Sequence, residues 1–200
     1  MMKSNFNIVF VFLMIGVICM FSSYGCSGNL KYERYSSKDI EINISMDYIS
    51  GWLYSEHRGS NDSYAQVIFY ELAKKDKTSR VGMAVTVEKS SKVRFQPLTL
   101  EAMADDLLNK RLKFKDARIL SKVNTSLFDT EALDIELSYK TLDKLYSADA
   151  KLIPVKERII IFKRNDRFYT LRYENTEEEF NKFAQAFTHC IGTLKFKDTE

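Results

Sequence analysis

Apolar and polar residues alternate with a period of two along most of the chain, which is the pattern of strands with one buried face. The runs 65–72 and 158–163 are instead apolar on both faces, which predicts strands covered from two sides. Asn165-Asp166 separates two such runs and is a signal for a tight hairpin. We expect strands over residues 40–46, 52–58, 65–72, 81–87, 117–123, 133–139, 158–163 and 168–173.

Two stretches follow a helical period instead. Over residues 100–113 the apolar side chains fall on one helical face, and Thr99 is suited to cap the amino end. Thr176 and Glu179 have the spacing of a capping box, and apolar residues then recur at helical steps as far as Leu194. The order of strands, helix, strands and helix predicts an α+β domain, a mainly antiparallel sheet flanked by helices in an α/β/α sandwich.

The amino-terminal segment has the pattern of an export leader. Lys3 precedes an apolar stretch over residues 8–21, and small or polar residues follow as far as Cys26. The stretch is shorter than the roughly 20 residues of a membrane-spanning helix and fits a signal-peptide core. Gly25-Cys26 resembles a bacterial lipoprotein box, in which the cysteine is acylated and becomes the new amino end. We therefore expect a lipoprotein-type signal peptide over residues 1–25 and a lipid, such as palmitate, on Cys26.

Two other interpretations of this segment remain open. Ser23 and Tyr24 differ from the residues usual in a lipoprotein box, so ordinary signal peptidase could cut near Ser23 or Gly25. The second interpretation is that the apolar stretch stays uncleaved and anchors the protein by spanning the membrane. With Cys26 acylated, the protein would be tied to a membrane on the extracytoplasmic side of a bacterial cell envelope. The polar residues 26–38 predict a tether, and residues 39–197 predict a single domain.

Composition narrows the possible chemistry. The 200 residues carry a net charge of +3 and include two histidines and three cysteines. Cys19 falls in the leader and Cys26 is expected to carry lipid, so Cys190 has no partner for a disulfide within the chain. No spacing of His, Cys and carboxylates fits a zinc site, and the glycines form no phosphate-binding loop. We expect no enzyme activity, no metal, no cofactor and no nucleic acid; a hydrolase that uses His57 or His189 is the alternative.

Two groups of side chains are candidate contact surfaces. Positive charge gathers where the first helix ends, at Lys110, Arg111, Lys113, Lys115 and Arg118. These residues either complement the helix dipole or contact anionic lipid headgroups. A long loop is expected over residues 142–154, where Leu145, Tyr146 and Leu152 either form an exposed apolar contact surface or pack on their own sheet.

Four stretches together resemble one known family. They are the strand and turn that end in Gly51-Trp52, the start of the first helix, the late hairpin and the last helix with its ending, at residues 40–52, 98–103, 157–173 and 180–196. They are similar to the PsbP-like family, the group with the Mog/PsbP-like fold. Relatives in that family are lumenal accessory subunits of photosystem II, and another binds a small GTPase. The resemblance implies a sheet flanked by helices and a non-enzymatic role. Together with the expected lipid on Cys26, it predicts a lipid-anchored accessory or assembly factor for a membrane protein complex. The alternative is an envelope lipoprotein that binds a small ligand in a cleft between sheet and helix.

Overall fold

The computed structural model describes residues 30–59, 63–71, 82–89, 99–143 and 150–197. The chain divides into two compact units, residues 1–30 and residues 31–200, and the fold described below is that of the second. The expected leader over residues 1–25, and Cys26 with it, lie outside the described residues. Within the described ranges, no helix has both the length and the apolar character needed to cross a membrane.

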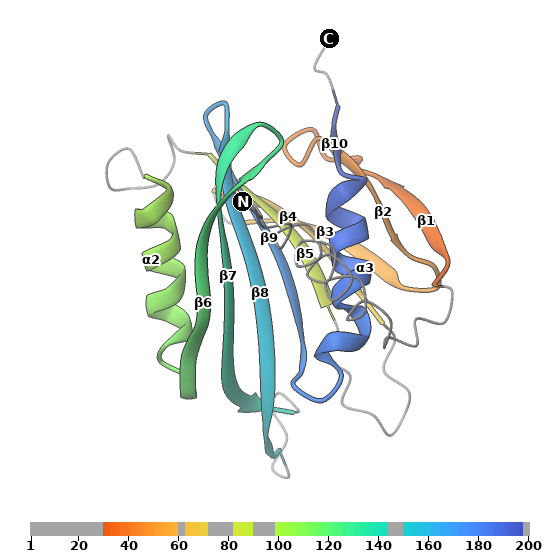
Figure 1. Cartoon of the computed structure of the whole chain (residues 1–200). Coiled ribbons are helices and arrows are strands. Elements are labelled where there is room, and N and C mark those ends of the chain that lie inside the picture. Colours follow the sequence, from red (N-terminus) through yellow and green to blue (C-terminus); the bar gives the residue numbers. More distant parts are fainter. Residues whose placement is uncertain (1–29, 60–62, 72–81, 90–98, 144–149, 198–200) are drawn as a thin grey trace, which may run out of the picture. The chain divides into compact units, whose positions relative to one another are not determined.

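A seven-stranded antiparallel sheet forms the centre of the domain (Figure 1). Its strands follow the order β3 (Leu53–Arg58), β4 (Tyr64–Tyr70), β5 (Gly82–Lys89), β9 (Arg167–Thr176), β8 (Leu152–Arg164), β7 (Thr130–Leu142) and β6 (Lys115–Leu127). A smaller antiparallel sheet has the order β1 (Tyr32–Ser36), β2 (Ile44–Ile49) and β10 (Lys195–Phe196). Two helices accompany the sheets, α2 (Leu100–Arg111) and α3 (Phe180–Gly192).

The two helices cover opposite faces of the large sheet. Neighbouring residues of a strand point to opposite sides, so the contacts of β8 show which helix lies on which face. Ile159 and Ile161 of β8 belong to the buried core beneath α2. Arg158 points the other way and lies over the ring of Phe187 in α3, 6.0 Å from its centroid. Tyr173 of β9, opposite Arg158 in the register, also contacts α3. The predicted α+β fold, an antiparallel sheet flanked by helices, is therefore confirmed.

The small sheet shares the α3 side of the large sheet and packs on it through aromatic rings. Tyr35 of β1 and Tyr48 of β2 lie 5.1 and 5.3 Å from Phe69 of β4, measured between ring centroids. The Tyr35 hydroxyl donates a hydrogen bond of 2.6 Å to Glu56 of β3. Tyr35 and Phe69 are both almost completely buried, so this contact is the core between the two sheets.

The expected tether over residues 26–38 is wrong in its second half. β1 occupies residues 32–36 and pairs with β2 along its whole length. Its alternation is invisible in the sequence because Tyr35 is its one large buried side chain, while Arg34 bonds Asp47 and Glu33 accepts from Tyr48. The folded domain therefore begins at residue 31 or 32 rather than 39.

Three predicted boundaries also shift. β2 begins at Ile44 rather than at residue 40, since residues 40–42 form a turn. Thr99 caps α2 as expected, accepting a hydrogen bond from the Ala102 amide. Of the capping box predicted before α3, one half forms: the Thr176 hydroxyl accepts a hydrogen bond of 3.4 Å from the Glu179 amide. The other half does not, because Asn175 rather than Glu179 accepts from the Thr176 amide, at 2.7 Å, and the helix begins only at Phe180. The loop expected over 142–154 is shorter, because β8 already begins at Leu152.

Candidate functional site

One end of the domain gathers exposed apolar side chains. β7 ends there, β6 and β8 begin there, and α2 reaches it with its carboxyl end, the lower end in Figure 1; we call it the basal end. Four large apolar side chains there are 39–45% exposed: Leu112, Phe114, Leu142 and Leu152. Leu142 and Leu152 face each other across β7 and β8. These four residues form the basal apolar set.

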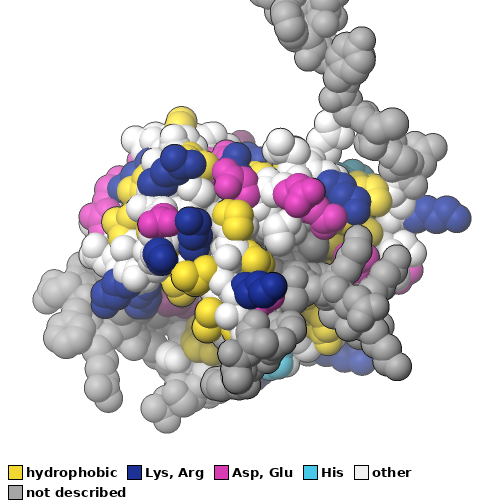
Figure 2. Space-filling view, turned by 90° about the horizontal axis from the view of Figure 1, so that it is seen from below, with side chains coloured by type: hydrophobic (Ala, Val, Ile, Leu, Met, Phe, Trp, Pro, Cys, Tyr) yellow, Lys and Arg dark blue, Asp and Glu magenta, His cyan; other side chains and the backbone are white. Residues whose placement is uncertain are grey.

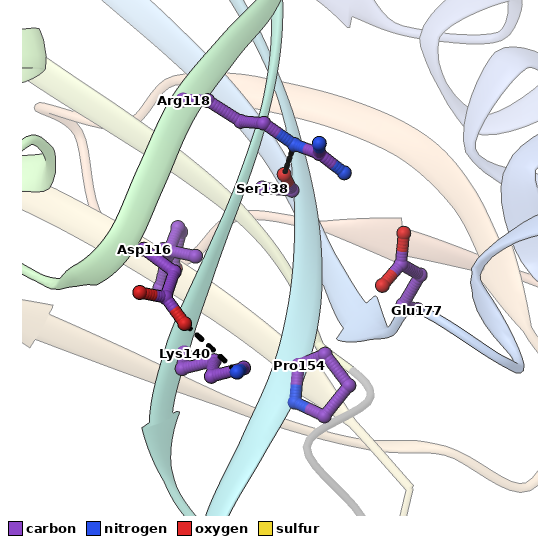
Figure 3. Close-up of a pocket in the computed structure, with 7 residues that line it drawn as sticks. Asp116, Arg118, Ser138, Lys140, Pro154 and Glu177 are labelled. Carbon is purple, nitrogen blue, oxygen red and sulfur yellow. Dashed lines mark hydrogen bonds and ion pairs between the residues drawn. The ribbon is translucent and has the colours of Figure 1, made fainter.

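A polar cleft of about 250 Å³ opens beside these residues. It is lined by Asp116, Arg118, Ser138, Tyr139, Lys140, Pro154 and Glu177. Figure 3 shows that the side chains come from β6, β7, the start of β8 and the turn after β9. Arg118 donates a hydrogen bond of 3.0 Å to Ser138. The basal cleft therefore exists only once four segments that are distant in sequence have come together.

Asp116 owes its place in the cleft to an irregularity of β6. The register with β7 shifts between Lys115 and Arg118, and Asp116 has a φ of +56°. Such a β-bulge redirects a side chain, and aspartate is among the few residues that tolerate this conformation. Its carboxylate lies 2.8 Å from the Lys140 ammonium. The hydrogen bond and charge of Lys140 hold the pKa of Asp116 below its usual value.

The lining of the basal cleft carries both signs of charge. Arg118 and Lys140 supply donors, and Asp116 and Glu177 supply acceptors (Figure 3). Because Asp116 already balances Lys140, neither an isolated cation nor an isolated anion finds a strong field there. A mixed set of donors and acceptors next to exposed apolar side chains is instead the composition of a protein-contact surface.

A buried ionic cluster lies on the α2 side of the same strands. Glu157 of β8 is fully buried, and its two oxygens accept hydrogen bonds of 2.6 Å from Arg111 and Arg172. The Tyr139 hydroxyl lies 2.8 Å from a Glu174 oxygen and 3.2 Å from a Glu157 oxygen, the two acceptors for its single proton. The cluster ties the carboxyl end of α2 to β7, β8 and β9, and so holds the basal end together.

Burial and charge oppose each other at Glu157. Burial raises the pKa of a carboxyl group, but the charges and hydrogen bonds of Arg172 and Arg111 outweigh it and hold the pKa of Glu157 below its usual value. Burial, together with the negative charges of Glu157 and Glu174, raises the pKa of Tyr139. Tyr139 therefore remains a neutral hydrogen-bond donor, and Glu157 remains a carboxylate between two guanidinium groups.

The residues predicted for the two contact surfaces are only partly brought together. Lys113, Lys115 and Arg118 are exposed at or near the basal end. Lys110 pairs with Asp106 at 2.6 Å along α2, and Arg111 is turned inward to Glu157. Of the predicted apolar surface, Leu152 is exposed in β8, whereas Leu145 and Tyr146 lie outside the described residues.

The sequence patterns did not predict Glu157 as a buried charge, although its position in its strand indicates burial. It stands in the inward series Val155, Glu157, Ile159, Ile161, where a period of two predicts an apolar side chain. The exposed Leu112, Phe114 and Leu142 were missed for a different reason, since each continues an apolar pattern beyond the part of its element that packs on the core.

The histidines and Cys190 lie away from the basal cleft. His189 stacks on Tyr32 with centroids 4.0 Å apart, and its Nε2 lies 3.2 Å from Asp47. Cys190 is buried, and burial together with the charge of Asp47 raises the pKa of its thiol to about 12. His57 is exposed, and its Nε2 is 2.9 Å from the Ser55 hydroxyl. Within the described ranges, no three His, Cys, Asp or Glu side chains are grouped so that they could hold a metal ion.

Known proteins resemble the chain in structure and not in sequence. No protein-family model matches it, and neither does any curated protein. The solution structure of cyanobacterial PsbP, CyanoP, from Synechocystis sp. PCC 6803 superposes with a TM-score of 0.53 at 13% identity, over 88% of this chain and 98% of CyanoP. The chain has the PsbP/Mog1-like fold.

Two further structures with the PsbP/Mog1-like fold superpose over almost their full length. LpqN, involved in cell envelope biogenesis of Mycobacterium tuberculosis, has a TM-score of 0.51 at 9% identity, over 85% of this chain and 92% of LpqN. The Ran-binding protein Mog1p from Saccharomyces cerevisiae has a TM-score of 0.50 at 9% identity, over 84% of this chain and 97% of Mog1p. At these identities the likeness extends to the fold alone, and at that level the resemblance expected from the sequence is confirmed.

Proposed function

We propose that the chain is a non-catalytic accessory or assembly factor of a membrane protein complex, held on the extracytoplasmic side of a bacterial membrane by acyl chains on Cys26. The observation that carries the proposal is a PsbP/Mog1-like domain that follows a segment with the sequence pattern of a lipoprotein-type leader. LpqN, with the same fold, is involved in cell envelope biogenesis, and Mog1p is a Ran-binding protein. These two relatives support an envelope setting and a binding role.

The start of β1 limits how far such a domain could move from its anchor. β1 begins at Tyr32, six residues after Cys26. A fully extended chain spans at most about 3.5 Å per residue, so the tether would reach roughly 20 Å. This is less than the thickness of a bilayer with its headgroups, roughly 40 Å. The tether would therefore keep the domain close to the membrane surface, where a protein of the same membrane is within its reach.

The basal end is the surface that we assign to this partner. Figure 2, which views the domain from below, shows apolar side chains lying between Lys, Arg, Asp and Glu side chains. Exposed apolar side chains among charged and polar ones are typical of protein contact surfaces. In this arrangement the basal apolar set packs on the partner, the basal cleft receives polar groups of the partner, and Lys113 and Lys115 lie toward anionic headgroups beside it.

Membrane fractionation tests the anchor. We expect Cys26→Ala to move the protein from the membrane fraction to the soluble fraction, because acyl chains supply roughly 0.8 kcal/mol per buried CH₂ group and cannot attach to alanine. Mass spectrometry of the wild-type amino end measures the lipid directly. Unchanged membrane retention of the variant would instead indicate a spanning anchor.

Site-specific photo-crosslinking in intact cells tests the contact surface. A photoreactive residue at Leu152 is expected to capture one membrane protein reproducibly. The matched control is Ile40, which is also apolar and exposed, at 68% against 45% for Leu152, but lies in the β1–β2 connection at the other end of the domain. The assignment of the basal end fails if both positions capture the same proteins, or if membrane-bound protein gives no adduct from Leu152.

A further inference from the structure

A second cleft lies at the end of the domain opposite the basal end. There the β8–β9 hairpin meets β10 and the residue that precedes β2, at the top of Figure 1. The cleft has a volume of about 280 Å³. It is lined by Asn43, Arg164, Asn165, Arg167, Tyr169, Phe196 and Lys197. Three of these residues are cationic, two are amides and none is acidic; we call this the apical cleft.

Arg164 is the cation best placed to bind a ligand. Its guanidinium lies over the ring of Phe196, 4.1 Å from the centroid. Stacking of this kind fixes the guanidinium plane and leaves its N–H edges available for hydrogen bonds. Among the residues that the structure describes, no carboxylate pairs with Arg164. Its charge is therefore held in place by an aromatic ring that cannot neutralise it.

The other polar side chains of the apical cleft are held mainly by backbone carbonyl groups. The Lys197 ammonium donates to the carbonyl of Ser37, and the Asn43 amide donates to that of Lys197 at 2.8 Å. Arg167 donates to the carbonyl of Glu41 at 2.6 Å and pairs with the Glu41 carboxylate at 3.1 Å. A carbonyl orients a cation without balancing its charge, whereas the Glu41 carboxylate partly balances the charge of Arg167.

Tyr169 indicates the sign of the field in this cleft. It is stacked on Phe162 with centroids 5.1 Å apart and is almost completely buried. Burial raises the pKa of Tyr169, while the positive charges of Arg167 and Arg164 act in the opposite direction. The two guanidinium groups therefore favour a negative charge beside the phenol oxygen, while burial, the larger effect, disfavours one on the buried oxygen itself.

We infer that the apical cleft binds a phosphate group. Fixed guanidinium, ammonium and amide donors around a partly enclosed space match the three or four oxygens of a phosphate better than any neutral ligand. The volume is at the lower limit of small-molecule pockets, and the rings of Tyr169 and Phe196 offer an apolar wall. The ligand is accordingly a small phosphate ester, either free in solution or the headgroup of an anionic phospholipid. This binding goes beyond the proposed docking function. A soluble ester is compatible with a basal end that faces the membrane, whereas a headgroup would place the apical end at the membrane instead.

Titration with inorganic phosphate and with glycerol phosphate, at constant ionic strength and followed by NMR, tests the inference. We expect saturable binding to the full chain carrying Cys26→Ala, and at least tenfold weaker binding after Arg164→Gln. Arg164→Lys keeps the charge but loses the stacked planar group, so it should weaken binding by a smaller factor. Lys195→Gln is the matched control, because it removes one positive charge from exposed β10 without lining the cleft.

Vesicles separate the two sources of phosphate. Binding to phosphatidylglycerol vesicles in excess of phosphatidylcholine vesicles, lost after Arg164→Gln, identifies a lipid headgroup. Saturable binding of glycerol phosphate without that excess identifies a soluble ester. The inference is overturned if neither probe binds saturably, or if Lys195→Gln weakens binding as much as Arg164→Gln does in variants that melt at the same temperature.

Discussion

Glu157→Gln is expected to lower the free energy of unfolding by about 3–5 kcal/mol, the usual cost of removing one partner from a buried ion pair. Glu157 is fully buried between Arg111 and Arg172, and glutamine has almost the same shape. The variant therefore keeps the packing and leaves two partly buried guanidinium groups without their carboxylate. Urea unfolding at pH 7 measures the loss. A change below about 1 kcal/mol would show that water already screens the pair.

Glu177→Gln is the matched control, since it makes the same chemical change at an exposed residue of the basal cleft. Its expected effect on stability is within about 0.5 kcal/mol. The difference between the two variants isolates burial and pairing from the simple loss of a negative charge.

The lowered pKa of Glu157 also determines how the free energy of unfolding depends on pH. Because the pKa of Glu157 is lower in the folded than in the unfolded state, its contribution is fully present above the unfolded value of about 4.3. It is lost as the pH falls through the lowered folded value, since the unfolded chain then binds the proton more readily. The gap between wild type and Glu157→Gln should accordingly narrow as the pH falls below about 4.

Phe69→Ala is expected to cost about 3–5 kcal/mol, the range for truncating a buried phenylalanine. Phe69 is completely buried, and its ring contacts Tyr35, Tyr48 and Tyr54. The cavity would therefore open at the contact between the two sheets. Thermal unfolding measures the loss, and near-ultraviolet circular dichroism should show the tyrosines losing their fixed environment.

Ile68→Ala controls for the loss of apolar volume in β4. Ile68 is the preceding residue, points to the opposite face and is only half-buried, so its truncation should cost less and leave the tyrosine signal unchanged. Equal losses from the two variants would contradict a special role of Phe69 between the sheets.

Local patterns predicted the parts of the fold that depend on local chemistry. The alternation over residues 133–139 identified β7, and Asn165-Asp166 identified the β8–β9 hairpin. Asn165 has a φ of +53°, as a tight hairpin turn requires, and asparagine adopts this conformation readily. Each of these signals lies within a few residues of the structure it predicts.

The features that were missed depend on contacts between distant segments. β1 carries one large buried residue, and it is a strand only because β2 offers a free edge and Phe69 a surface for Tyr35. The basal cleft joins Asp116 to Lys140 through a bulge that no local pattern marks. No short window of sequence contains either arrangement, so the candidate site could be foreseen only as separate groups of charged and apolar residues.

The position of β1 also decides how mechanical force would enter the domain. A pull through the amino-terminal segment acts first at Tyr32, and β1 transmits it to β2, which β10 flanks on its other side. From there the load passes to the large sheet through Tyr35 and Phe69. If a membrane-bound partner pulled the basal end away from a lipid anchor at Cys26, the small sheet would bear that force before the basal end does.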